Sequence, residues 1–273
     1  MYQASFSGYE PLPNQEVTRL LQTYHSNNWG MRGGDVEKVP PKGIQRILTL
    51  GDSVNNGGSQ VNDENTYPAQ LEKLYKNSGR AVEVLNSSAG GWAIENEYKW
   101  IFDHGLYGAS TVILEFNEKD LDQKFVDASI LDGDVSFPKN KPIFALQEIY
   151  FRYLLPKLRL SQSADPGSTA SDFDTSSSQN VLKIVSALHD FTSMHQAKLI
   201  ILYWDLRDDG SNMDVIRARE KLFSFAASQH IKLLRPKTAI GKGWGSEIFR
   251  DVIHPNAYGN KMIAEFVFNN AGV

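Results

Sequence analysis

The 273-residue sequence contains no cysteine, which excludes disulfide bonds, thiolate nucleophiles and thiolate metal sites. It has no apolar run approaching the roughly 20 residues that a membrane-spanning helix requires. The 28 basic and 32 acidic residues nearly balance, with a net charge of −4, so neither nucleic acid nor an anionic membrane is expected as the main partner. The His, Asp and Glu residues show no metal-ligand spacing, and we expect neither a metal ion nor another cofactor.

The N-terminus lacks the basic and then apolar pattern of a signal peptide. This predicts either a cytoplasmic protein or an exported protein whose signal has been removed, so the compartment stays open. Nothing in the sequence indicates an oligomeric state.

Residues 1–43 are punctuated by proline and glycine and show little periodicity, apart from one short helix expected around 16–24. We interpret them as an arm packed on a single domain that comprises residues 44–273. A separate N-terminal module is the less favoured alternative.

From residue 44 onwards, apolar runs typical of strands alternate with segments of helical periodicity. Strands are predicted at 45–50, 82–85, 111–116, 198–204 and 231–234. Helices are predicted between Thr66 and Gly79, around 94–101, 181–188 and 213–228, and near the C-terminus. Such alternation predicts a parallel sheet covered by helices on both faces.

Residues 121–180 interrupt this alternation. They contain an expected helix at 143–155, followed by a Ser- and Asp-rich stretch from 161 to 179 that is expected to be flexible. We interpret the region as an insertion at the mouth of the site, because loops of this length within a compact domain are usually functional or disordered.

The first predicted strand ends in Gly51-Asp52-Ser53 and continues into a turn that contains Gly57 and Gly58. In an open parallel sheet, ligands bind beyond the carboxyl ends of the strands, so Ser53 is expected at the rim of such a crevice. Asp52 is expected to hydrogen-bond the backbone of the turn rather than to act as an acid catalyst.

Asp251 and His254 lie three residues apart just before the last predicted helix, so one turn could present both side chains to Ser53. A serine hydroxyl becomes a nucleophile when a base accepts its proton and a third group orients that base. His254 is the predicted base and Asp251 the carboxylate that orients it. The negative charge that develops on an ester oxygen requires preorganised donors, for which we predict the backbone N–H groups of Ser53 and Gly91. Gly90 is the alternative to Gly91.

Together, Gly51-Asp52-Ser53 with Gly57, Asn86 with Gly91, and Asp251-x-x-His254 resemble the GDSL, or SGNH, hydrolases, in the order in which that family carries these motifs. The resemblance spans residues 51–254. It implies a flavodoxin-like, three-layer α/β/α sandwich around a five-stranded parallel sheet. It also implies that Ser53 is the nucleophile, with Asp251 and His254 completing the triad.

One motif departs from that family, whose third block normally reads Gly-x-Asn-Asp and supplies an asparagine to the oxyanion hole. An ungapped alignment puts Lys119 at the asparagine position and Asn117 at the glycine position. Either Lys119 serves as a charged donor, which we favour, or Asn117 reaches the site through a shifted loop. Loss of this donor would cost about 10²–10³ in rate, which leaves a non-catalytic relative as an alternative.

The sequence therefore predicts a serine esterase acting on short acyl esters, with an acetyl group on a carbohydrate as the expected substrate by resemblance. A lipid esterase or thioesterase, a sugar O-acyltransferase using the same triad, and a degenerate carbohydrate- or anion-binding relative remain alternatives. Two features could contribute to substrate contact, although core packing and a solvated loop explain them as well: the tryptophans Trp92, Trp204 and Trp244, and the acidic residues Asp205, Asp208 and Asp209.

Overall fold

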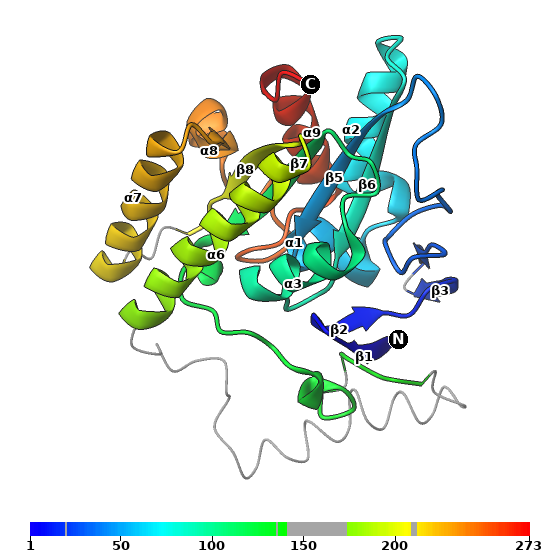
Figure 1. The fold of residues 1–273 in the computed structure, drawn as a ribbon, viewed down its shortest axis with the longest axis horizontal. Coiled ribbons are helices and arrows are strands. Elements are labelled where there is room, and N and C mark those ends of the chain that lie inside the picture. Colours follow the sequence, from blue (N-terminus) through cyan, green and yellow to red (C-terminus); the bar gives the residue numbers. More distant parts are fainter. Residues whose placement is uncertain (20, 135, 141–173, 209–211) are drawn as a thin grey trace.

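The computed structural model describes residues 1–19, 21–134, 136–140, 174–208 and 212–273. Its centre is a five-stranded parallel sheet in the order β6-β5-β7-β8-β9 (Figure 1). The strands are β5 (Gln45–Gly51), β6 (Val82–Ser88), β7 (Thr111–Asn117), β8 (Lys198–Trp204) and β9 (Lys232–Leu234). All five predicted strands are present, and β6 extends three residues beyond its predicted end.

Helices cover both faces of the sheet, as Figure 1 shows, which confirms the predicted three-layer α/β/α architecture. Helices α3, α6 and α7 enclose one hydrophobic core, and α2 and α9 enclose the other. The helices are α2 (Tyr67–Asn77), α3 (Ile94–His104), α6 (Thr175–Met194), α7 (Met213–Ser228), α8 (Pro236–Ile240) and α9 (Ala257–Asn270). No helix in the described part of the chain is long and apolar enough to cross a membrane.

The two cores follow from the alternation of side chains along each buried strand. In β5, Leu48 and Leu50 face the core beneath α3 and α6, whereas Ile47 faces the core beneath α2 and α9. In β7, Val112 and Ile113 divide between the two cores in the same way. Because successive side chains of a strand point to opposite faces, a continuous apolar run indicates a strand covered on both sides.

The N-terminal region forms two antiparallel hairpins, so the helix predicted around 16–24 was wrong. The first hairpin joins β1 (Tyr2–Ser5) to β2 (Gly8–Pro11), and the second joins β3 (Gln15–Arg19) to β4 (Gln22–Ser26). Val17 lies opposite Tyr24 and Thr18 opposite Thr23. Cross-strand pairs of β-branched and aromatic residues stabilise a hairpin, and here they outweigh the weak helical pattern.

The segment after these hairpins contacts the edge of the central sheet. Arg32 forms an antiparallel bridge with Asn86 of β6, and its backbone N–H donates to the Asn86 carbonyl over 2.9 Å. The Nε1 of Trp92 donates to the Tyr9 carbonyl over 2.8 Å, which pins the first hairpin to the chain that follows β6. On these contacts we propose that residues 1–43 are an arm of one domain formed by 44–273.

The predicted insertion at 121–180 is described only in part, and the helix expected at 143–155 lies outside the described residues. The predicted end of the flexible stretch, at residue 179, was wrong, because α6 already begins at Thr175. The Asp174 carboxylate accepts hydrogen bonds from the backbone N–H groups of Ser176 and Ser177. This N-cap allows a serine-rich sequence to start the helix.

Candidate active site

The carboxyl ends of the parallel strands bring the predicted site loops to one edge of the sheet. Gly51 at the end of β5 pairs with Ser88 of β6, and Asn117 at the end of β7 pairs with Trp204 of β8. The chain leaves each of these strands on the same side, as predicted from parallel topology.

Ser53 is the first residue of the short helix α1 (Ser53–Asn56), and its neighbours explain why the chain turns there. The Asp52 carboxylate caps the helix by accepting from the Val54 N–H over 2.7 Å, which confirms its expected bond to the backbone. A Cβ at position 51 would lie 2.5 Å from Asn55 and 3.0 Å from Glu115, so only glycine fits there.

His254 joins Ser53 to Asp251. Its Nε2 lies 2.8 Å from the Ser53 Oγ, and its Nδ1 lies 2.7 Å from the Asp251 Oδ2. The other oxygen of Asp251 accepts from the backbone N–H groups of His254 and Ile253 over 2.7 and 2.9 Å. Burial tends to raise the pKa of Asp251, but these backbone bonds and the His254 side chain outweigh burial and lower it. The carboxylate therefore stays ionised beside the imidazole.

Arg250 tethers the loop that carries Asp251 and His254 to the helix that carries Ser53. Its Nη1 donates to the Gly57 carbonyl over 3.0 Å, and its backbone N–H donates to the His254 carbonyl over 3.0 Å. Its Nε lies 3.8 Å from the Asp251 Oδ2. Gly57 is the left-handed C-cap of α1. The tether therefore connects the end of α1 to the loop that carries Asp251 and His254. No motif in the sequence pointed to Arg250.

The loop after β6 passes close to Ser53, since a Cβ built on Gly90 would lie 3.9 Å from the Ser53 Cβ. Within the described residues, neither the N–H of Ser53 nor that of Gly91 has a hydrogen-bond acceptor. The Tyr9 hydroxyl donates to the Gly90 carbonyl over 2.6 Å, and the Gln123 side chain donates to the Gly91 carbonyl over 3.0 Å. Neither Tyr9 nor Gln123 was predicted from the sequence to contact this loop.

Asn117, the last residue of β7, and Lys119, two positions further on, differ in their contacts. Asn117 is fully buried: its side-chain oxygen accepts from the Lys119 N–H over 2.9 Å, and its side-chain nitrogen lies 3.4 Å from the Asp52 Oδ2. The Lys119 side chain is exposed, and no described residue accepts a hydrogen bond from its ammonium group or pairs with it. The Asn117 side chain is thus occupied by hydrogen bonds within the protein, whereas the Lys119 ammonium group is available to contact a ligand.

Four carboxyl groups are buried together beneath the candidate site: Asp52, Glu97, Glu115 and Asp120. Neither oxygen of Glu97 has a hydrogen-bond partner in the described part of the chain, and the Glu115 carboxyl group lies against that of Asp52. Burial, and then repulsion between the neighbouring carboxyl groups, raises the pKa of Glu97 and Glu115 well above the usual range. Within the described residues, no group of three or more His, Cys, Asp or Glu side chains is arranged to hold a metal ion.

The two other features considered for substrate contact have structural partners. The tryptophans are buried in the cores, and Trp204 and Trp244 pack on one another at 4.4 Å between ring centroids. Asp205 is buried and accepts two hydrogen bonds from Arg235, while Asp208 pairs with Arg207. Asp209 lies outside the described residues. These contacts favour core packing and structural ion pairs.

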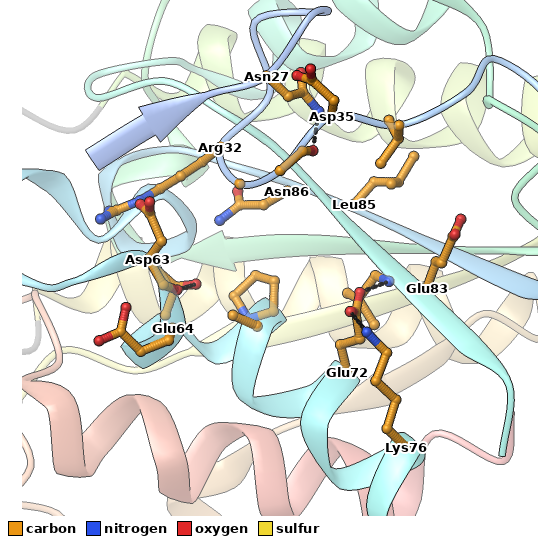
Figure 2. A pocket seen from close by; sticks show the side chains of 17 residues that line it. Asn27, Arg32, Asp35, Asp63, Glu64, Glu72, Lys76, Glu83, Leu85 and Asn86 are labelled. Carbon is orange, nitrogen blue, oxygen red and sulfur yellow. Dashed lines mark hydrogen bonds and ion pairs between the residues drawn. The ribbon is translucent and has the colours of Figure 1, made fainter. Parts of the chain in front are cut away.

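A cavity of about 410 Å³ lies along the outer edge of β6. Figure 2 shows Arg32 and Asp63 at one end of it and Glu72 beside Lys76 at the other. The six predicted site residues, all of which are described, do not line this cavity. Arg32 donates to Asp63 and to the carbonyls of the turn after α1, so its guanidinium supports that turn.

No protein-family model and no curated protein matches the sequence. Solved structures do match the fold. A member of the lipolytic protein G-D-S-L family from Veillonella parvula DSM 2008 aligns with a TM-score of 0.52 and 16% identity, over 83% of this chain and 97% of that chain. TesA aligns with a TM-score of 0.54 and 14% identity, over 84% and 98% of the two chains.

An acetyl xylan esterase, AlAXEase, aligns with a TM-score of 0.51 and 15% identity, over 84% of this chain and 100% of that chain. At such low identity these likenesses concern the fold alone. They show that this chain has the fold of the G-D-S-L lipolytic proteins, as the sequence motifs predicted.

Proposed function

We propose that this protein is a serine ester hydrolase of the SGNH type, with Ser53 as nucleophile, His254 as base and Asp251 as the group that orients the base. The observation that carries the proposal is the continuous hydrogen-bonded chain from Asp251 through His254 to the Ser53 Oγ. Two features support it further: the N–H groups of Ser53 and Gly91, which have no acceptor among the described residues, and a fold shared with G-D-S-L proteins.

Acylation begins when the Ser53 Oγ attacks the ester carbonyl carbon and its proton passes to the Nε2 of His254. The hydrogen bond from Nδ1 to Asp251 fixes the tautomer whose Nε2 lone pair accepts that proton, and the carboxylate stabilises the imidazolium that forms. The bond between the carbonyl carbon and the alcohol oxygen then breaks. His254 gives its proton to the departing alcohol, and the acyl group remains on Ser53.

Deacylation repeats these steps with water. The oxygen of the water molecule attacks the acyl carbon while His254 accepts a proton from that water. The bond between the acyl carbon and the Ser53 Oγ then breaks, His254 returns the proton to the Oγ, and the carboxylic acid departs. In both steps negative charge develops on the carbonyl oxygen. The N–H groups of Ser53 and Gly91 are the proposed donors to it, with Lys119 as the third donor because Asn117 is engaged with Asp52.

The proposed substrate is a short acyl ester, with an acetyl group on a carbohydrate as the first candidate. The acetyl xylan esterase that shares this fold supports that choice. The fold is also shared with lipolytic proteins, so an ester of another alcohol is an alternative substrate. A lipid esterase, a thioesterase or a sugar O-acyltransferase would use the same three residues.

The first test compares hydrolysis of nitrophenyl acetate and nitrophenyl octanoate by the wild type and by Ser53→Ala. We expect the wild type to prefer the acetate, and the variant to lose activity by about 10³-fold or more because the nucleophile is gone. Ser59→Ala, in the turn Gly58–Gln60 that follows α1, is the matched control and should keep wild-type activity. Equal activity of Ser53→Ala and wild type would refute the proposed nucleophile.

A carbohydrate- or anion-binding relative without activity is the second candidate, and the exposed Lys119 at the position of the usual asparagine favours it. A fluorophosphonate probe separates the two functions. Labelling of the wild type, but not of Ser53→Ala, indicates an activated serine, whereas absence of labelling together with absence of ester hydrolysis would favour the binding protein.

A further inference from the structure

The peptide between Gly90 and Gly91 carries the second proposed oxyanion donor, the Gly91 N–H. Neither residue has a side chain to limit rotation of this peptide, and Gly91 has a φ of +78°, which favours glycine. A donor stabilises a developing oxyanion only when it is already oriented, since reorientation during the reaction would cost free energy. A contact outside these two residues must therefore hold the peptide.

Tyr9 provides this contact. Its hydroxyl donates to the Gly90 carbonyl over 2.6 Å, although the two residues are 81 positions apart in the sequence. A trans peptide is planar, and its C=O and N–H groups point in opposite directions. The bond to the Gly90 carbonyl thus fixes the direction of the Gly91 N–H, and Gln123 holds the next carbonyl in the chain.

Tyr9 is itself held firmly. It is fully buried in β2, and its ring packs against Tyr2 and Phe137 at centroid distances of 5.7 and 5.3 Å. Its carbonyl accepts from the Trp92 side chain, so the hairpin is attached to the same loop at a second point. Burial raises the pKa of Tyr9 far above its usual value, so the phenol keeps its proton and remains a donor.

We infer that Tyr9 is a positioning residue for the reaction, because its hydroxyl orients the Gly90–Gly91 peptide so that the Gly91 N–H faces the developing oxyanion. The inference rests on the proposed ester hydrolase function. It assigns the first hairpin, which Figure 1 shows beside α3, a part in the geometry of the site without contact to the reacting atoms.

The test is Tyr9→Phe, which removes the hydroxyl and keeps the packed ring. We expect kcat for the preferred nitrophenyl ester to fall about tenfold, less than for the complete loss of a donor, while KM changes by less than about twofold. The inhibition constant of phenylboronic acid, which forms a tetrahedral adduct with an active-site serine, should rise by the same factor as kcat falls. A purely structural role would not produce this match.

Tyr2→Phe is the matched control, because Tyr2 belongs to the same aromatic group and its hydroxyl has no hydrogen-bond partner among the described residues. It should leave kcat and KM unchanged. Gln123→Ala, which leaves the hairpin intact, should lower kcat and weaken boronate binding in the same way as Tyr9→Phe, so the test does not depend on the folding of one variant.

Two negative outcomes are distinguishable. An active wild type with an equally active Tyr9→Phe variant would overturn the role of Tyr9 and leave the esterase proposal standing. A wild type that hydrolyses no ester would overturn both proposals.

Discussion

At the scale of single residues, the rate of the proposed hydrolysis depends on which side chain serves as the third oxyanion donor. The side chain of Asn117 is buried and engaged with Asp52 and the Lys119 backbone, whereas the ammonium group of Lys119 is exposed and unpaired in the described part of the chain. An ammonium group offers three N–H donors and no acceptor, so it can replace an amide as a donor to an oxyanion.

We predict that Lys119→Ala lowers kcat for ester hydrolysis by about 10²-fold with little change in KM, because a donor that acts only in the transition state is lost. Lys119→Asn should recover much of this loss. Lys124→Ala serves as control, since Lys124 is exposed and pairs with Asp174. Unchanged kinetics of Lys119→Ala would remove Lys119 from the oxyanion hole and return the role to Asn117.

The residues that could be proposed from the sequence are those that lie within short motifs. Asp251 and His254 are three positions apart, and glycines mark the turn around Ser53, so local spacing reveals them. Tyr9 and Arg250 could not be found in this way, because they contact residues 81 and 193 positions away. Only the folded chain brings such partners together.

At the scale of structural elements, the separation between α1 and the loop before α9 sets the distance between Ser53 and His254. Arg250 spans that separation through its bond to the Gly57 carbonyl, and its guanidinium also lies beside the Asp251 carboxylate. The guanidinium is planar and presents several fixed donors, so lysine is a poor substitute at such a position.

We predict that Arg250→Ala lowers kcat about tenfold, since a small displacement of a catalytic group has a large effect on rate. Arg250→Lys should recover little, and added methylguanidine should restore part of the activity of the alanine variant. Arg217→Ala is the control, because Arg217 is exposed on α7 and its side chain pairs with Asp214. If methylguanidine has no effect and the control is equally impaired, the tether is not the cause.

Strands and helices were predicted correctly from the sequence where burial gives their apolar residues a clear pattern. They were predicted wrongly where specific contacts, such as cross-strand pairs or a helix cap, determine the local structure. The apolar runs of β5, β7 and β8 are covered on both faces, so they could be read as strands of a parallel sheet. The hairpin of β3 and β4 depends on cross-strand pairs, and the start of α6 depends on the cap at Asp174. Neither interaction gives a periodic signal.

At the scale of the whole molecule, the fold brings Asp52, Glu97, Glu115 and Asp120 into one buried group. None of the four forms an ion pair in the described part of the chain, although the charges of His254 and Lys119 act on Asp52 and Asp120. Burial raises the pKa of all four groups in the folded state, and repulsion from neighbouring carboxyl groups raises the pKa of Glu97, Glu115 and Asp120 further. The folded protein therefore binds more protons than the unfolded chain above pH ~4.3, where a free glutamate ionises. The contribution of these groups to stability is fully present below that pH and is lost as the pH rises.

We predict that Glu97→Gln becomes increasingly more stable than the wild type as the pH is raised from 5.5 to 9, because the neutral amide replaces a carboxyl group that resists ionisation. Each such group contributes a slope of about 1.4 kcal/mol per pH unit, and about 1 kcal/mol corresponds to about 2–4 °C in melting temperature for a chain of this size. Thermal melting of both proteins across this pH range measures the difference. Glu95→Gln, on the same turn of α3 but paired with Lys99 near the surface, should show no such growth with pH. A difference between Glu97→Gln and wild type that stays constant with pH would mean that Glu97 is already ionised in the folded protein.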